Sequence, residues 1–220
     1  QLRTSLSKTH RCTVKQILRG LGGIFIAAGV FAGSALAKDK PVLVELYTSQ
    51  GCSSCPAADV LFQDLAQRPG IVGLAFHVDY WDYIGWQDIF ARAEFTKRQK
   101  SYAKRHGAKM VYTPQVVVQG REFVVGSKPM DVAQAIKTQS HDETGVRVML
   151  TRGAAGLSVT ITGTPPAQVK QPIVYVAEFI PSQQVSIQAG ENAGHKWTYT
   201  NIVTRLTPLS AYSAPKFEQS

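Results

Sequence analysis

The sequence predicts an α/β fold followed by an antiparallel β extension, on three observations. An apolar run, an amphipathic segment and a second apolar run follow one another over residues 42–78, the pattern of a βαβ unit. Two β-branched runs over residues 115–125 indicate a β-hairpin. Beyond Ser140, short strand-like runs separated by Gly, Pro and Asn are typical of an antiparallel β unit. We therefore expect an α/β domain over residues 38–140 and a β-rich C-terminal extension or subdomain over residues 141–220.

Residues 1–37 have the composition of a cleaved secretory signal peptide. Five basic residues and no acidic ones accompany an apolar segment, residues 21–31, that is too short to cross a bilayer. Ala35-Leu36-Ala37 supplies a small-x-small site, so cleavage is expected after Ala37, with an uncleaved anchor as the alternative. Cleavage would leave 19 basic and 15 acidic residues, a formal net charge of +4 in place of +9. We therefore expect a periplasmic or secreted protein without stable membrane insertion, and no nucleic-acid partner.

The first strand, helix and second strand are expected over residues 42–48, 55–67 and 71–78. Both strands are continuous β-branched and aliphatic runs, as expected of strands that are buried on both faces. Pro56 suits the first turn of the helix, and Arg68-Pro69-Gly70 ends it. The crossover between the two parallel strands should be right-handed.

An aromatic and acidic loop follows, and then the elements that complete the α/β domain. A helical pattern covers residues 87–106 and ends at Gly107. Gln119-Gly120-Arg121 joins the two strands of the hairpin, and a last helix is expected to begin near Ser127. Further short strands are expected over residues 146–150, 157–162, 173–179, 185–188 and 197–203.

Cys52 and Cys55, at C-x-x-C spacing, are the candidate catalytic residues. Cys12, the third cysteine, lies in the predicted signal peptide. Free backbone N–H groups and the helix dipole would stabilise the thiolate of Cys52 at the helix N-terminus. Cys55, one turn into the helix, is placed to resolve a mixed disulfide formed by Cys52 with a protein or small-thiol partner. In an oxidising compartment the pair could cycle or stay locked.

Thr113-Pro114, immediately before the third strand, is the second informative element. Downstream of a C-x-x-C βαβ unit, it suggests the cis-proline loop that faces the dithiol in thioredoxin-like folds. A cis bond would turn the preceding backbone outward to pair with an extended substrate; the alternative is a proline that merely begins a strand. Thr113, Pro114, Gly51 and Trp81 are therefore the candidate substrate-binding residues.

Glu45 is the third catalytic candidate, since it is a carboxylate inside an apolar strand, seven residues before Cys52. A buried acid there would have a raised pKa and could carry the proton of Cys55. The alternatives are a position at the strand edge and an ion pair with a lysine.

No metal and no cofactor are expected. His77, Asp79 and Asp82 could join the cysteines in a Cu(I) or Zn site, but one cysteine pair makes no convincing ligand set with the histidines. A strand-end role for His77 and loop-capping roles for the aspartates are preferred. The aromatic residues Trp81, Tyr83 and Trp86 are expected to form a packed lid over the end of the sheet, or to line a substrate groove.

Four blocks of this sequence resemble a bacterial exported family, the domain of unknown function 1223. The blocks are residues 44–59 with both cysteines, residues 75–86, Tyr112-Thr113-Pro114-Gln115 and Gly190-Glu191-Asn192-Ala193-Gly194. The resemblance covers about residues 41–206. It implies a thioredoxin-like βαβ…ββα core with a C-terminal β extension, and it implies no activity.

Thioredoxin itself is matched only in part. Gly51 takes the place of a tryptophan, and Ser53-Ser54 takes the place of Gly-Pro, so redox potential and partner choice do not transfer. Three hypotheses follow: an exported thiol–disulfide oxidoreductase-like protein, a non-catalytic binding module with a structural disulfide, and a copper metallochaperone. In the second hypothesis the turn over residues 190–194 would meet a partner, although Asn192 and Gly194 there are more typical of hairpin geometry.

Overall fold

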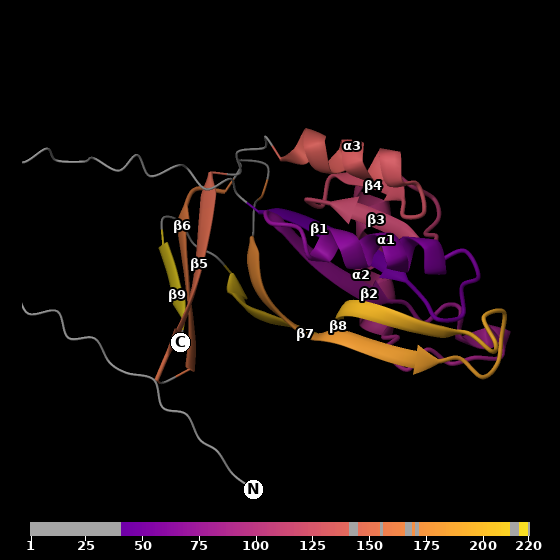
Figure 1. Ribbon diagram of the computed structural model, residues 1–220. Helices are drawn as coiled ribbons and strands as arrows, with labels where there is room; N and C mark the ends of the chain where they lie inside the picture. Colours follow the sequence, from indigo (N-terminus) through magenta and orange to yellow (C-terminus); the bar gives the residue numbers. More distant parts are fainter. Residues whose placement is uncertain are drawn as a thin grey trace, which may run out of the picture. The chain divides into compact units, whose positions relative to one another are not determined.

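Two parallel strands, β1 (Val42–Thr48) and β2 (Ile71–His77), form the centre of the main sheet and are joined by helix α1 (Pro56–Ala66). The structure is a computed structural model that describes residues 41–140, 145–154, 156–165, 169, 172–211 and 216–219. Figure 1 shows α1 lying along these strands. The predicted βαβ unit is thereby confirmed, with Cys55 as the N-cap residue of α1. The predicted signal peptide, Cys12 included, lies outside the described residues.

The predicted hairpin and last helix complete a mixed α/β fold. Strand β3 (Gln115–Val118) is antiparallel to β1 and to β4 (Glu122–Val125), and helix α3 (Pro129–Gln139) follows. The expected βαβ…ββα order is confirmed.

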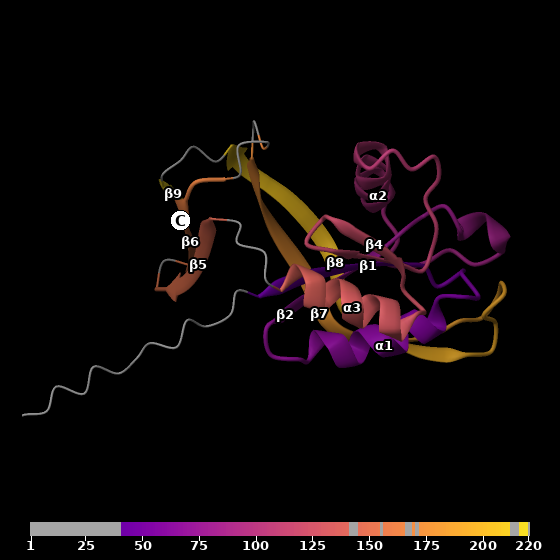
Figure 2. The ribbon, with the colours of Figure 1, turned by 90° about the horizontal axis from the view of Figure 1, so that it is seen from above.

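Helices cover both faces of this sheet (Figure 2). Helices α1 and α3 share a core with one face, to which β1 contributes Val44 and Leu46. Helix α2 (Ala93–Arg105) packs on the other face, against a core that includes Tyr47 and Phe76. Since successive side chains of a strand point to opposite faces, Glu45 faces α2.

Helix α2 begins at Ala93, six residues after the predicted start, so that part of the prediction was wrong. The side chain of Asp88 accepts a hydrogen bond from the backbone N–H of Phe90 at 2.9 Å and contacts His77 at 2.7 Å. These contacts hold the segment in a loop, and Arg92 at the N-cap is extended, with φ −140°. Tertiary contacts therefore override the helical pattern.

A long hairpin extends the main sheet beyond β2. Strand β7 (Ile173–Ser186) pairs with β8 (Lys196–Ala211), and β8 runs parallel to β2, which gives the order β4-β3-β1-β2-β8-β7. The two short strands predicted over residues 173–179 and 185–188 are thus parts of one strand. Pro181 lies inside β7, and an edge strand tolerates it because one row of its N–H groups needs no partner.

A second, three-stranded sheet has the order β5-β6-β9, with β5 (Val146–Gly153), β6 (Gly156–Gly163) and β9 (Lys216–Gln219) all antiparallel. The antiparallel character predicted for this part of the chain is therefore confirmed. Across the residues described above, no helix combines the length and the apolar character that crossing a membrane requires.

Candidate functional site

Cys52 and Cys55 are joined by a disulfide at the N-terminus of α1, with their Cα atoms 5.4 Å apart. Tight backbone turns form the loop, because the Cys52 N–H donates to Ser49 O and the Cys55 N–H donates to Cys52 O, each at 3.1 Å. The predicted position of the cysteine pair, between the first strand and its helix, is confirmed.

The disulfide is covered. Cys52 is 1% exposed and Cys55 is fully buried. Part of the cover is the segment after β2: a Cβ added at Gly51 would lie 3.2 Å from the Trp81 carbonyl oxygen and 3.4 Å from a methyl group of Ile84. A side chain before Cys52 would crowd this segment, so Gly51 allows the close approach.

The turn over residues 190–194, which joins β7 to β8, supplies a second part of the cover. The Asn192 side-chain amide donates to Gln50 O at 2.8 Å and to Cys52 O at 3.0 Å. Gly190 and Gly194 have φ values of 74° and 81°, so these glycines do serve the turn geometry that the sequence suggested. The Asn192 side chain, however, holds the cysteine loop from 140 residues away.

Pro114 follows a cis peptide bond, as the sequence predicted. The β1–β3 register pairs Tyr47 with Gln115, which puts Thr113 and Pro114 at the end of the sheet from which the cysteine loop emerges. The Trp81 indole N–H donates to the Thr113 hydroxyl at 2.6 Å. Because Trp81 also lies against Gly51, it brings together the residues predicted to bind substrate.

Glu45 does not join the disulfide. It is 1% exposed and accepts hydrogen bonds from Arg98 at 2.6 and 3.1 Å, from Tyr102 at 2.9 Å and from Tyr47 at 2.8 Å. The alternative of an ion pair therefore holds, with an arginine in place of the expected lysine. Burial, with the Glu45 charge second, raises the pKa of Tyr102. The Glu45 carboxylate is therefore bound to side chains of α2, whereas Cys55 is the N-cap residue of α1, which lies on the opposite face of the sheet.

Asp59 is the buried acid on the same helix as Cys55. Its N–H donates to Cys55 O at 3.1 Å, and residues four apart share one face of a helix. Asp59 is 8% exposed. Burial raises the pKa of its carboxyl to about 7, although the His77 charge and the Thr48 hydroxyl act to lower it.

His77 and Asp88 form a fully buried pair beside Asp59, with His77 Nδ1 2.7 Å from Asp88 Oδ2. Burial alone would lower the pKa of His77, but the Asp88 charge and hydrogen bond outweigh it, so the pKa of His77 is raised. The same Asp88 oxygen accepts the Gln50 N–H at 2.8 Å, which ties the pair to the cysteine loop. Among the described residues, His77 Nε2 is buried without a hydrogen-bond partner.

The aspartates considered as metal ligands have capping contacts instead. Asp79 accepts a hydrogen bond from the Thr96 hydroxyl at 2.6 Å, and Asp82 accepts the Asp88 N–H at 3.1 Å. Within the described ranges, no three His, Cys, Asp or Glu side chains are grouped so that they could hold a metal ion.

Three site residues escaped the sequence reasoning: Asp59, Asp88 and Asn192. The i+4 spacing of Asp59 from Cys55 could have identified it as a residue of the site. Asn192 stands in one of the blocks that resemble the exported family. No sequence pattern indicated that Asp88 belongs to the site, because it lies in the segment that was predicted to be helical.

Comparisons with known proteins give a family and a fold. A family model described as "Protein of unknown function (DUF1223)" matches residues 43–219. A crystal structure of an Agrobacterium tumefaciens protein is 30% identical, covering 83% of this chain and 78% of its own, with a TM-score of 0.72. HBP35 of Porphyromonas gingivalis is similar in fold alone, at 14% identity and a TM-score of 0.50, covering 82% of this chain and 63% of its own. No curated protein matches.

Proposed function

The chain belongs to the DUF1223 family of proteins of unknown function, and from its site we propose an exported thiol–disulfide oxidoreductase that exchanges the Cys52–Cys55 disulfide with thiols. The observation that carries the proposal is Asp59, a buried carboxyl one helical turn beyond Cys55 with a pKa raised to about 7. Such an acid can give up or accept a proton near neutral pH, which disulfide exchange requires. The thioredoxin-like order of elements supports the same chemistry.

The exchange proceeds in two steps that conserve atoms and electrons. A partner thiolate attacks Cys52 Sγ, the disulfide breaks, and Cys55 leaves as a thiolate that takes a proton from Asp59. A second partner thiolate then attacks the partner sulfur of the mixed disulfide and releases the Cys52 thiolate. The partner is oxidised to a disulfide, the protein is reduced to a dithiol, and the reverse reaction uses the same groups.

Backbone groups around the disulfide suit a thiolate and an extended partner. Cys52 precedes α1, whose dipole favours an anion at the helix N-terminus. The loop with Thr113 and Pro114 lies at the same end of the sheet, and Trp81 connects it to Gly51. We propose that a partner segment pairs with this loop once the cover over Cys52 has opened.

Trapping of mixed disulfides tests the order of the two cysteines. Cys55→Ser should accumulate a mixed disulfide with a small-thiol disulfide or a protein partner, and Cys52→Ser should not. Equilibration of the wild-type protein with thiol buffers should give a reduction potential of the Cys52–Cys55 disulfide above about −300 mV. A lower potential without exchange would refute the proposal, and trapping through Cys55 alone would reverse the assigned roles.

A second candidate, a non-catalytic binding module with a structural disulfide, is favoured by one observation. Cys52 is 1% exposed, and Asn192 holds its carbonyl oxygen. Exchange by a reactive cysteine needs an accessible sulfur, whereas a structural disulfide does not. The potential and the exchange rate described above separate the two candidates.

A further inference from the structure

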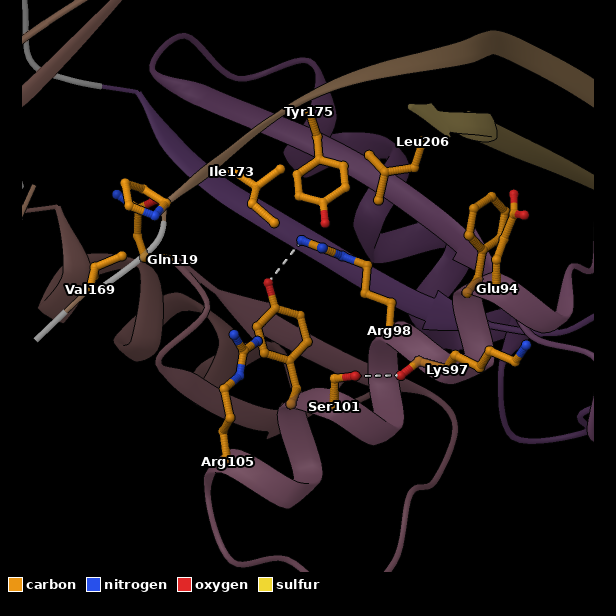
Figure 3. Close-up of a pocket in the computed structure, with 13 residues that line it drawn as sticks. Glu94, Lys97, Arg98, Ser101, Arg105, Gln119, Val169, Ile173, Tyr175 and Leu206 are labelled. Carbon is orange, nitrogen blue, oxygen red and sulfur yellow. Dashed lines mark hydrogen bonds between the residues drawn. The ribbon is translucent and has the colours of Figure 1, made fainter. Parts of the chain in front are cut away.

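A cavity of about 880 Å³ lies between α2 and the β7–β8 hairpin, apart from the disulfide site (Figure 3). Side chains of α2 form one wall, side chains of the hairpin and of the segment before it form the other, and Gln119 of the β3–β4 turn also lines the cavity. None of its lining residues belongs to the cysteine loop, the Thr113-Pro114 loop or the turn over residues 190–194. The volume lies in the range of small-molecule sites.

The wall formed by α2 is basic, and one of its arginines is held rigidly. Arg98 donates through Nε and Nη2 to Glu45, and Nη2 also donates to the Tyr102 hydroxyl at 3.0 Å. Among the described residues, none accepts a hydrogen bond from Nη1, which can therefore bind a ligand. The Arg105 guanidinium lies 4.7 Å from the centre of the Tyr102 ring. In the described part of the chain, no carboxylate lies within ion-pair distance of Arg105.

The charges of the described residues around the cavity leave an excess of one positive charge. Among the described residues that line it, three are basic, Lys97, Arg98 and Arg105, and one is acidic, Glu94. Glu45, beneath Arg98, neutralises a second positive charge. This balance fits a ligand with a single negative charge.

The opposite wall is apolar and accessible. Ile173 and Tyr175 of β7 are 51% and 46% exposed, and both line the cavity. Leu206 of β8 lies close to them, since β8 pairs Leu206 with Ala177. Figure 3 shows the Tyr175 hydroxyl pointing toward the Arg98 guanidinium. Contiguous exposed apolar side chains beside a polar group are more typical of a binding site than of the rest of a protein surface.

We propose that this cavity binds an aliphatic monocarboxylate. The carboxylate lies between Arg98 Nη1 and Arg105, where planar guanidinium groups match its two oxygen atoms. The alkyl chain lies along Ile173, Tyr175 and Leu206 and removes their apolar surface from water. An acidic peptide fits less well, because several negative charges would meet one excess positive charge and a largely apolar wall.

Calorimetric titration of the full chain with decanoate tests the proposal, with decanamide as the uncharged probe of equal length. Saturable binding of decanoate is expected below about 1 mM, with decanamide at least about tenfold weaker. Arg105→Gln should weaken decanoate binding about tenfold, because it removes one charge-assisted hydrogen bond. Ile173→Ser should weaken it several-fold through lost apolar contact.

Lys104→Gln is the matched control, since Lys104 is the exposed neighbour of Arg105 but does not line the cavity. It should change the affinity less than twofold, and both charge variants should keep the wild-type near-UV circular dichroism. The proposal is overturned if decanoate does not bind, if decanamide binds equally well, or if Lys104→Gln weakens binding as much as Arg105→Gln. Tighter binding of hexaglutamate than of decanoate would also overturn it, in favour of an acidic peptide.

Discussion

Replacing Asp59 by asparagine should flatten the dependence of stability on pH. Burial raises the pKa of Asp59 from 3.8 to about 7 in the folded protein. A shift of about three units, at 1.36 kcal/mol each, corresponds to about 4 kcal/mol. Because the folded pKa is the higher one, this stability is present below about pH 4 and is lost as the pH rises to 7. Between pH 5 and 7, the wild-type free energy of unfolding should fall by about 2 kcal/mol through this group.

His77 changes stability in the same direction. Its folded pKa is raised by Asp88, after the opposing effect of burial, and in part by Asp59. Its stabilising contribution is therefore present below the unfolded pKa of 6.5 and is lost as the pH rises through the folded pKa. Asp59→Asn keeps the His77–Asp88 pair, so the variant should retain a smaller loss of stability at higher pH.

Urea unfolding of the disulfide-bonded protein from pH 5 to pH 8 measures both contributions. Asp64→Asn is the matched control, because Asp64 lies exposed on the same helix, and its slope should equal that of the wild type. If the wild type and Asp59→Asn lose equal stability between pH 5 and 7, Asp59 is ionised throughout that range. That result would also remove Asp59 as the proton donor to Cys55 in the proposed exchange.

Two further substitutions test the cover and the buried ion pair. Asn192→Ala should speed reduction of the disulfide by a small thiol about tenfold, as measured by quenched alkylation, because it frees Gln50 O and Cys52 O; an unchanged rate would mean that Asn192 does not limit access. Glu45→Gln should lower the free energy of unfolding by about 3 kcal/mol, because Arg98 keeps its charge without its carboxylate partner. The same variant should leave the pH profile of disulfide exchange unchanged, and a shifted profile would return Glu45 to the proton pathway.

Local patterns predicted most of the α/β core. Continuous apolar runs identified β1 and β2, since strands covered on both faces carry few polar residues. Helix α1 was bounded by Pro56 and by the Arg68-Pro69-Gly70 stop, both of which act within a turn. The positions of the cysteine pair and of Pro114 could be predicted because the cysteine pair follows β1 and Pro114 immediately precedes β3.

Features set by distant contacts could not be predicted in the same way. Asp88 receives the Gln50 N–H and contacts His77, and these long-range bonds remove a helical turn that the sequence pattern favoured. The contact from Asn192 to Cys52 spans 140 residues, and nothing local in the turn indicates it. The sequence predicted two short strands where β7 is continuous. An edge strand tolerates Pro181, and the edge position of β7 depends on the assembly of the whole sheet, which no local pattern indicates.

The two-residue period of the first strand carries a signal about Glu45 that the sequence analysis did not use. Val44 and Leu46 flank it and face α1, so the two-residue period of a strand directs Glu45 to the other face. The proton donor that we propose for Cys55 is Asp59, which follows Cys55 by four residues on α1. The two-residue period of the strand and the i, i+4 spacing of the helix together therefore place Glu45 and Asp59 on opposite faces of the sheet.

The covered disulfide makes access the first event of any exchange. Gln50 is held at three points, by Asp88 at its N–H, by Asn192 at its carbonyl and by Trp86 at its side chain. A thiol that reacts only with the open state does so at a rate proportional to the open fraction. The rise in reduction rate for Asn192→Ala then equals the rise in that fraction, provided that reduction of the unfolded chain is unchanged. A partner that draws the turn over residues 190–194 away from Cys52 would raise the open fraction through its higher affinity for the open state, which would make this turn the element that selects partners.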